Sequence, residues 1–356
     1  MIIHIAFPLA DLPTGGGNQF LRALRDYFRE IEVYSESLYD ADVIIANGHQ
    51  WRIYLYALFR VKRKSRKTAI IHRVDGPMAT VRGGENSKLI DLSIARFNNI
   101  FADGTIFQSN WSKHACIQSG MSRMKPSVII HNASDPRIFY SNRSPYSKGS
   151  KIKIISTSWS SNWLKGFDIL QYLDKNLDFN KYEVTFIGNS PVRFTNIRKI
   201  APLRSTELAA HLRENSIFLA PSHVEACSNS LIEAMSCGLI AVARNNSSHP
   251  EIVGDAGVLF SDEKDVISAI EIVAGDLSKF SDRQSHKLCM AYVGEQYLDF
   301  AAAVRERQLL VPTWSDFFRL KAEAFINQRV ALPILNKLYL RKKAMISTKW
   351  RCGDKG

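Results

Sequence analysis

The sequence lacks any apolar run of the roughly 20 residues that a membrane-spanning helix needs. Its first residues, Met1–Pro8, also lack the basic start of a signal peptide. Cysteine is scarce: the five cysteines are scattered, with no Cys-x-x-Cys pair, which argues against a zinc site and fits a reducing compartment. These absences predict a cytoplasmic protein.

Motifs of several common enzyme classes are missing too. There is no Walker loop, no Gly-x-Ser-x-Gly elbow, and no set of His, Asp and Glu at metal-ligand spacing. Gly15-Gly-Gly17 follows an expected strand, but Phe20 stands where a dinucleotide-binding fingerprint has Gly or Ala. The sequence therefore predicts no metal and no bound cofactor.

Basic residues exceed acidic ones, and the excess lies in two segments. The net charge is +13 at pH 7. Residues 58–67 carry six basic and no acidic side chains, and residues 327–356 carry eight basic side chains and one acidic one, so these segments account for the whole excess. Nucleic acid, an acidic glycan and an anionic membrane are all compatible with such patches.

What the sequence does contain is an alternation of short Ile- and Val-rich runs with helical patterns, which predicts βαβ units and parallel sheets. The polar segment Asn132–Ser150 divides the alternation into two sets and is typical of an interdomain linker. We therefore expect an α/β protein with two Rossmann-like, doubly wound domains, at residues 1–140 and 151–312. The expected strands are Ile2–Phe7, Glu32–Ser35, Val43–Ala46, Thr68–His72, Gly104–Gln108 and Ser127–His131, then Lys153–Thr157, Glu183–Ile187, Ile197–Ile200, Ile217–Ala220, Ile240–Arg244 and Val258–Phe260.

The most informative stretch is residues 220–238, Ala-Pro-Ser-His-Val-Glu-Ala-Cys-Ser-Asn-Ser-Leu-Ile-Glu-Ala-Met-Ser-Cys-Gly. It places Glu225 in a turn after an expected strand, and Glu233 inside the next helix. Two carboxylates on either side of a helix start can converge on one ligand, and the helix N-terminus between them offers N–H groups to a phosphate. A nucleotide-sugar needs both kinds of partner.

Glu233 has a second interpretation. Ser230-Leu-Ile-Glu233 also fits a capping box, in which the glutamate merely satisfies a backbone N–H at the helix start. Those four residues alone support the two interpretations equally well, and the surrounding motifs favour a ligand-binding role for Glu233.

Two further motifs flank this stretch. Trp163-Leu-Lys-Gly166 precedes it and Pro250-Glu-Ile-Val-Gly-Asp-Ala-Gly257 follows it. The ordered set resembles the family-4 retaining glycosyltransferases, whose signature is two Glu separated by seven residues, the second in a Glu-Ala-Met-x-x-Gly context, and then a Pro-Glu-Ile-Val turn. The resemblance implies the GT-B fold, with an N-terminal acceptor domain and a C-terminal donor domain facing across a cleft, a helix at 313–326 that returns to the first domain, and a basic tail at 327–356.

The resemblance also implies roles for individual residues. Glu225 would hold the donor sugar, Lys165 the diphosphate, and His72 would lie near the donor sugar, so these three form the expected catalytic set. His72 has an alternative as a histidine packed under a loop and satisfied by the backbone. The expected donor-binding residues are Glu233, Ala226, Cys227, Ser228, Asn229, Gly16 and Gly17, and the acceptor-side candidates are Asp75 and Arg73.

The sequence departs from the family at one point. The family places an arginine a few residues before the lysine, but Ser158-Trp-Ser-Ser161 contains none. Asn162, the serine hydroxyls, Arg22 or Arg73 could substitute. Asp40-Ala-Asp42 matches the metal-binding Asp-x-Asp of a different glycosyltransferase fold, but it is far from the other motifs and is interpreted as a solvated turn.

We therefore expect a retaining, metal-independent glycosyltransferase that moves a sugar from a nucleotide-diphosphate sugar to a hydroxyl of a glycan or lipid-linked acceptor. Family analogy suggests cell-surface polysaccharide or lipopolysaccharide biosynthesis. The alternative is a non-hydrolysing sugar-nucleotide epimerase of the same fold. A nucleic-acid-binding protein ranks third, because its basic residues should interleave with aromatic ones across a fold surface.

The two basic segments, residues 58–67 and 327–356, suggest an anionic membrane surface as a partner, which would place the enzyme at the cytoplasmic face of the inner membrane. In the alternative, the helix at Trp51 packs into the first domain and the tail is solvated. For Tyr54 and Leu58 packing is the favoured interpretation.

Overall fold

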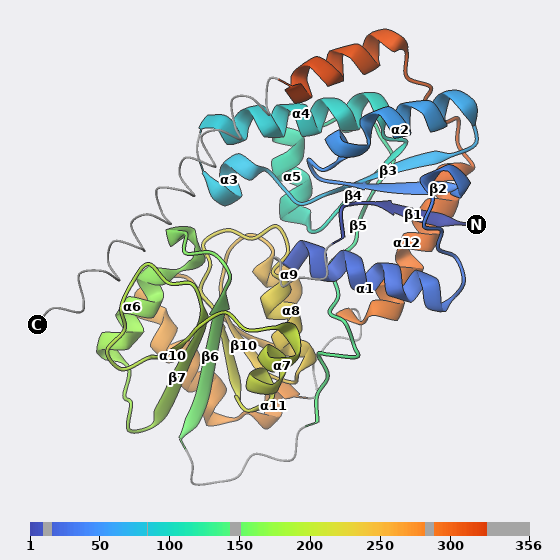
Figure 1. The fold of residues 1–356 in the computed structure, drawn as a ribbon. Coiled ribbons are helices and arrows are strands. Elements are labelled where there is room, and N and C mark those ends of the chain that lie inside the picture. Colours follow the sequence, from blue (N-terminus) through green and yellow to red (C-terminus); the bar gives the residue numbers. More distant parts are fainter. Residues whose placement is uncertain (10–15, 84, 143–150, 282–287, 326–356) are drawn as a thin grey trace, which may run out of the picture.

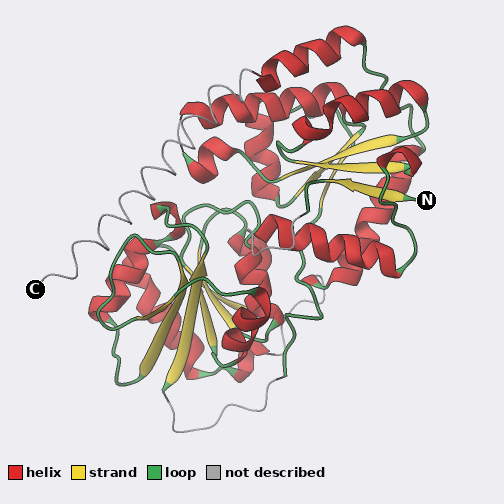
Figure 2. Cartoon of the chain, viewed as in Figure 1, coloured by secondary structure: helices red, strands yellow, loops and turns green. Residues whose placement is uncertain are grey.

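The computed structural model describes residues 1–9, 16–83, 85–142, 151–281 and 288–325. It contains two parallel sheets, each covered by helices on both faces (Figures 1 and 2). The predicted α/β class and the two doubly wound units are thereby confirmed. The chain leaves the first sheet after β5 and enters the second at β6, so the polar segment after residue 131 does connect the two.

The first sheet has the strand order β1-β2-β3-β4-β5. Three of its strands, with the sequences Ile-His-Ile-Ala, Val-Ile-Ile-Ala-Asn and Ala-Ile-Ile-His-Arg-Val, are rich in Ile, Val and Ala and buried at every position, as expected for a sheet covered on both faces. Parallel pairing brings the C-terminal ends of all these strands to one edge, where the following loops gather. The strands are β1 (Ile3–Ala6), β2 (Val43–Asn47), β3 (Ala69–Val74), β4 (Gly104–Phe107) and β5 (Ser127–Ile129).

Helices from both ends of the chain cover this sheet. One face carries α1 (Gly16–Glu30) and α12 (Met290–Arg305), which share a core with β1 to β4 through residues such as Phe20 and Tyr297. The other face carries α2 (Trp51–Lys64), α4 (Glu85–Phe101) and the helix at 314–325, packed around Phe59 and Phe97. The remaining elements of this half are η1 (Leu38–Asp40), α3 (Met78–Arg82) and α5 (Asn110–Gln118).

The second sheet has the order β11-β10-β9-β6-β7-β8. Its strands are β6 (Ile152–Ser158), β7 (Tyr182–Gly188), β8 (Arg198–Ile200), β9 (Ile217–Ala220), β10 (Ile240–Arg244) and β11 (Gly257–Phe260). Its helices are η2 (Trp163–Lys165), α6 (Phe167–Asn176), α7 (Ser205–Arg213), α8 (Asn229–Ser236), α9 (His249–Val253), α10 (Glu263–Gly275) and α11 (Ser278–Ser281). Two apolar cores lie on its two faces.

One expected strand does not form. Glu32–Ser35 makes only an isolated bridge, between Tyr34 and Ile3. The reason is local: Glu32 has a φ of 57°, a left-handed turn directly after α1, so too few extended residues remain for a strand.

The chain also returns to the first sheet earlier than the expected helix at 313–326. Residues of α12 from Met290 to Val304 are already buried in the first sheet's core. The helix at 314–325 then adds a second layer of contact, with Phe317 and Leu320 against the opposite face. The basic tail, residues 327–356, lies outside the described residues.

Candidate functional site

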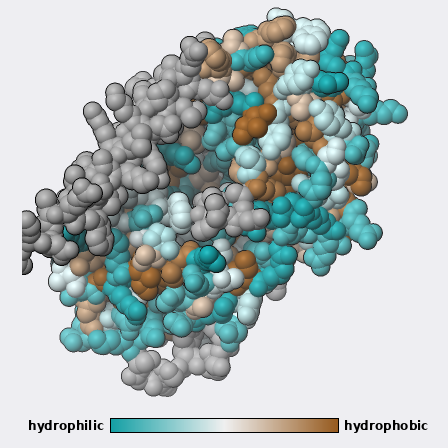
Figure 3. Space-filling view, in the orientation of Figure 1, coloured by the Kyte–Doolittle hydropathy of each residue, from teal (hydrophilic) through white to brown (hydrophobic). Residues whose placement is uncertain are grey.

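The C-terminal edges of the two sheets face each other, and loops from both meet there. A Cβ added to Gly16, at the start of α1, would lie 2.5 Å from the Asn229 side chain at the start of α8. A Cβ on Gly76, after β3, would lie 2.9 Å from that of Ala226. The surface is recessed between the two halves (Figure 3). Glycine at position 16 therefore permits two helix N-termini to approach across the interface.

Lys165 and Glu225 form an ion pair at this edge of the second sheet. Lys165 Nζ lies 2.6 Å from Glu225 Oε1, and both side chains are partly exposed. Gly166 follows the lysine with a φ of +81°, and a Cβ there would lie 2.2 Å from the carbonyl oxygen of Pro221. The turn that presents Lys165 to Glu225 thus requires glycine, which explains the Lys-Gly pair in the sequence.

The loop between Glu225 and α8 is held by the first half of the protein. Ser109 Oγ donates to the carbonyl oxygen of Ala226 at 2.7 Å. Cys227 Sγ accepts from Asn132 N at 3.4 Å, and Asn132 Nδ2 donates to Asn229 Oδ1 at 2.9 Å. Ser228 occupies the N-cap of α8 without a side-chain cap bond, so the first N–H groups of this helix have no intrahelical partner.

Glu233 does not form the capping box. The helix begins two residues earlier than that motif requires, with Ser228 and not Ser230 at the N-cap, and no N-cap side chain bonds to it. Within the described residues the Glu233 carboxyl has no hydrogen-bond or ion-pair partner, although the residue is buried. Burial alone raises its pKa to about 8. An unpartnered buried acid in the middle of α8 can accept hydrogen bonds from the hydroxyl groups of a ligand.

His72 was predicted to be catalytic, and the structure encloses it in the protein. The residue is fully buried in β3, its Nε2 lies 2.9 Å from the carbonyl oxygen of Gly48, and its ring packs edge-on against Phe97. Burial lowers its pKa to about 4. These contacts favour the alternative, a histidine packed under a loop and satisfied by the backbone.

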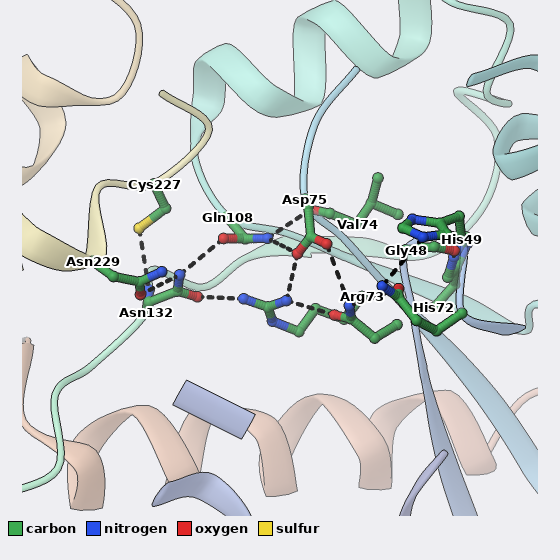
Figure 4. A network of polar contacts seen from close by, with 12 residues as sticks. Gly48, His49, His72, Arg73, Val74, Asp75, Gln108, Asn132, Cys227 and Asn229 are labelled. Atoms are coloured by element: carbon green, nitrogen blue, oxygen red, sulfur yellow. Dashed lines mark hydrogen bonds and ion pairs between the residues drawn. The ribbon is translucent and has the colours of Figure 1, made fainter. Parts of the chain in front are cut away.

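Arg73 is likewise not available to an acceptor. It is fully buried, and its guanidinium donates to Asn47 Oδ1, to Asp75 Oδ1 at 2.7 Å and to Asn132 Oδ1 at 2.6 Å (Figure 4). A buried cation with this many acceptors holds loops in place. Arg73 therefore supports the site from beneath and cannot replace the family's phosphate-binding arginine.

Asp75 sits above this network and remains accessible. Its side chain is 41% exposed although one oxygen is paired with Arg73. Gln108 Nε2 donates to the same oxygen at 2.6 Å, and Asn47 Nδ2 lies 3.3 Å from the other (Figure 4). The next residue, Gly76, contacts Ala226, so this acceptor-side candidate lies beside the Glu225 loop. Gly17, in the first turn of α1, faces open space, with no atom within 4 Å of an added Cβ.

Two residues of the site were not identified from the sequence. His49 follows β2 at the same sheet edge, and burial, with smaller contributions from Arg52 and Arg82, lowers its pKa to about 4. Glu251, in the Pro-Glu-Ile-Val turn, accepts hydrogen bonds from Asn110 N at 2.8 Å and Trp111 N at 3.1 Å in the other half. A position directly after a parallel strand could have indicated His49, but nothing local to the sequence indicates the partners of Glu251.

No three His, Cys, Asp or Glu side chains converge as metal ligands anywhere in the described part of the chain. Of the Asp40-Ala-Asp42 segment, Asp42 accepts from Ile2 N at 2.8 Å and pairs with Arg305 at 3.0 Å. These contacts place it at the N-terminal end of β1, away from the site. Among the described helices, none combines the length and apolar character that crossing a bilayer demands.

Comparison with known proteins shows similarities in sequence and in fold. Residues 171–276 match the family model "Glycosyl transferases group 1". A curated protein described as an uncharacterized 41.2 kDa protein in the cps region of Klebsiella pneumoniae is 28% identical over 185 residues, which are 48% of this chain. The matched segment spans about half the length of that relative, 51%.

The structural neighbours extend over most of the chain. Anabaena Alr3699/HepE, solved with UDP, has a TM-score of 0.64 at 15% identity and covers 85% of this chain and 100% of its own. Sucrose-phosphate synthase from Thermosynechococcus elongatus has a TM-score of 0.58 at 15% identity, over 84% of this chain and 82% of its own. The chain thus has the two-domain GT-B fold, and its group 1 segment together with these neighbours supports a glycosyltransferase.

Proposed function

We propose that the protein is a retaining glycosyltransferase that uses a nucleotide-diphosphate sugar and no metal. The observation that carries the proposal is the Lys165–Glu225 pair beside the N-terminus of α8, with the unpartnered Glu233 carboxyl in the same helix. These groups supply a cation and N–H donors for a diphosphate, and two acids for sugar and ribose hydroxyls.

The chemistry assigned to these residues follows from where charge develops. As the glycosidic C–O bond breaks, the diphosphate gains negative charge and the sugar becomes oxocarbenium-like. Lys165 and the N–H groups of α8 would stabilise the leaving diphosphate, each by about 3 kcal/mol. Glu225 would hold the sugar hydroxyls and support the positive ring. In a retaining reaction of this type the acceptor attacks on the leaving-group face, and a phosphate oxygen takes its proton.

The acceptor would enter from the first half of the protein. Asp75 is the accessible carboxylate there, and its neighbour Gly76 touches Ala226 in the loop that follows Glu225. Asp75 can therefore accept a hydrogen bond from the acceptor hydroxyl. We propose a glycan or lipid-linked acceptor in cell-surface polysaccharide or lipopolysaccharide assembly. Support for this pathway comes from the cps-region relative, to which about half of the chain is similar.

Two measurements test the proposal directly. A thermal-shift screen with UDP, GDP, ADP and dTDP sugars should give one base that raises the melting temperature. NMR of the product formed with the bound donor should then show the anomeric configuration of the donor retained. Inversion of that configuration would contradict the retaining mechanism, and donor release without transfer would favour an epimerase or hydrolase.

We further propose that the enzyme docks on the cytoplasmic face of an anionic membrane. The helix at 314–325 and α2 lie side by side (Figure 1), and their outer surface exposes Ile53, Tyr56, Trp314 and Phe318. Arg60, Arg63 and Lys64 are exposed on the same helix α2. Apolar side chains next to cations are suited to an anionic bilayer surface.

Part of the basic run at 58–67 does not contribute to this surface. Lys62 is fully buried, and its Nζ pairs with Asp103 at 2.7 Å. Leu58 also packs inside, as favoured from the sequence. The helical period of α2 divides the run between the core and the surface, and only its outward residues can meet a lipid headgroup.

A further inference from the structure

Asn132 connects the two halves of the protein at the proposed donor site. It follows β5, where the chain leaves the first sheet, and it is fully buried. Its Oδ1 accepts from Arg73 Nη2 at 2.6 Å, and its Nδ2 lies 2.9 Å from Asn229 Oδ1 (Figure 4). Asn229 is the first residue of α8. One side chain therefore joins a buried arginine of the first half to the start of a helix in the second.

The chemistry of the partners fixes the direction of these hydrogen bonds. A guanidinium only donates, so the oxygen of the Asn132 amide must face Arg73. Gln108 leads to the same orientation independently. Its Nε2 donates to Asp75 Oδ1 at 2.6 Å, which leaves its Oε1 to accept from Asn132 Nδ2 at 2.9 Å. Asn132 Nδ2 is therefore a donor, and Asn229 must present its oxygen to it.

The NH2 group of Asn229 is then left at the place where two helix N-termini meet. A Cβ added to Gly16, the first residue of α1, would lie 2.5 Å from Asn229 Nδ2, so glycine at this position makes room for the group. Asn229 is half-buried, and no residue that the structure describes accepts a hydrogen bond from its Nδ2. The N-termini of α1 and α8 favour an anion here, and this N–H donor suits a phosphate oxygen.

We propose that Asn132 is a positioning residue for the donor diphosphate, which holds the Asn229 amide so that its Nδ2 donates to a phosphate oxygen. Arg73 acts through Asn132. A cation that donates to the oxygen of an amide polarises the amide and strengthens the hydrogen bond that its NH2 group donates. This inference rests on the proposed transferase function, and it supplies a substitute for the family's arginine, which residues 158–161 lack.

The test is calorimetric titration of the protein with UDP, GDP, ADP and dTDP, and then with the nucleoside of the base that binds. Asn132→Asp keeps the shape of the side chain and the acceptor for Arg73, but it cannot donate. Asn229 must then turn its NH2 group toward the new carboxylate and its oxygen toward the phosphate. We expect the affinity for the nucleoside diphosphate to fall about tenfold or more, and the affinity for the nucleoside to stay unchanged.

Two variants of Asn229 complete the experiment. Asn229→Asp places a carboxylate directly against the phosphate, so it should weaken binding of the diphosphate more than Asn229→Ala does. This comparison carries the test if Asn132→Asp does not fold. In the Asn229→Ala background, Asn132→Asp should cause no further loss, because the residue through which it acts is gone. Asn215→Asp, at another buried asparagine, whose Nδ2 donates to the carbonyl oxygen of His211 at 2.7 Å, is the matched control and should leave both affinities unchanged.

Three results would overturn the inference. The first is a nucleoside diphosphate affinity of Asn132→Asp equal to that of the wild type. The second is an equal loss of nucleoside affinity, which would show a general structural role. The third is an additive effect of the substitutions at positions 132 and 229. If none of the nucleoside diphosphates binds the wild type, the proposed function itself fails, and this inference fails with it.

Discussion

Glu251 Oε2 accepts a hydrogen bond from the backbone N–H of Asn110 at 2.8 Å, so a side chain of the second half caps helix α5 of the first. The carboxylate also lies 3.4 Å from His131 Nε2. Burial opposes the ionisation of Glu251, but the nearby His131 and the hydrogen bonds from Asn110 and Trp111 outweigh burial and lower its pKa to about 2. The Pro-Glu-Ile-Val turn therefore joins the two halves of the protein through hydrogen bonds to Glu251.

Glu251→Ala should destabilise the protein by about 1–2 kcal/mol, because the N–H groups of Asn110 and Trp111 at the start of α5 lose their acceptor while Ser109 still caps Ser112 N. Because the pKa of Glu251 is lower in the folded protein, its contribution to the free energy of unfolding is fully present above the unfolded pKa of about 4.5 and is lost as pH falls toward 2. Denaturant titrations at pH 7 and pH 3 measure this, with Glu214→Ala, at an exposed position, as the control. If the free energies of unfolding of the variant and the wild type differ by the same amount at both pH values, Glu251 does not act through its charge.

Glu225→Gln should reduce sugar transfer by about a hundredfold or more, because it keeps the shape of the side chain and removes the charge that supports the sugar ring. Lys165 loses its partner at 2.6 Å in this variant, so donor affinity is measured in parallel. Glu271→Gln, on the exposed side of α10, is the control. Near wild-type transfer by Glu225→Gln would remove Glu225 from the catalytic assignment.

Glu233→Gln should stabilise the protein increasingly as pH rises. The folded wild-type holds its proton up to a pKa of about 8, whereas the unfolded chain releases it near 4.5. Between these values the wild type loses up to about 1.4 kcal/mol per pH unit from this group, and the glutamine variant does not. The melting temperatures of the wild type and Glu233→Gln are compared from pH 5 to pH 9. A difference that stays constant over this range would contradict the raised pKa.

Nucleotide binding should release a proton near pH 7, because ribose hydroxyls that donate to Glu233 favour its ionised form. Calorimetry in buffers with different ionisation enthalpies measures the release, which should disappear in Glu233→Gln together with part of the donor affinity. If Glu233→Ala lowers the melting temperature and leaves donor affinity unchanged, Glu233 is structural and the ribose assignment fails.

Transfer should continue in EDTA. Lys165 and the N-terminus of α8 supply positive charge for the diphosphate, which is the part a divalent ion plays in other transferases. The measurement is the transfer rate before and after chelation. Complete loss in EDTA, with recovery on addition of manganese or magnesium, would contradict the metal-independent mechanism.

Sedimentation with vesicles tests the membrane proposal. Binding should require anionic lipid and weaken with salt, since each exposed cation near the surface contributes about 1 kcal/mol. Phe318→Ser and removal of residues 327–356 should each reduce it, whereas Tyr292→Ser, exposed on α12, should not. Equal binding to neutral and anionic vesicles would refute the proposal and leave the transferase assignment intact.

The sequence by itself determined the architecture and the central residues of the proposed donor site. Strands buried on both faces are continuous Ile and Val runs, and helices alternate with them, so the two parallel sheets can be read from composition and order. Lys165 and Glu225 each follow a strand of one parallel sheet. Parallel pairing brings such positions to one edge, which is why their proximity could be anticipated.

Tertiary structure decided which polar residues are accessible. His72 and Arg73 lie near the end of β3. Phe97 of α4 packs against His72, and Asn132, which follows the edge strand β5, accepts a hydrogen bond from Arg73, so both residues are buried. Asp75, two residues after Arg73, remains accessible. Local sequence does not encode such distant partners. The start of α8 at Asn229 and the hydrogen bonds that Glu251 accepts likewise depend on contacts between segments far apart in the chain, which only the packed structure brings together.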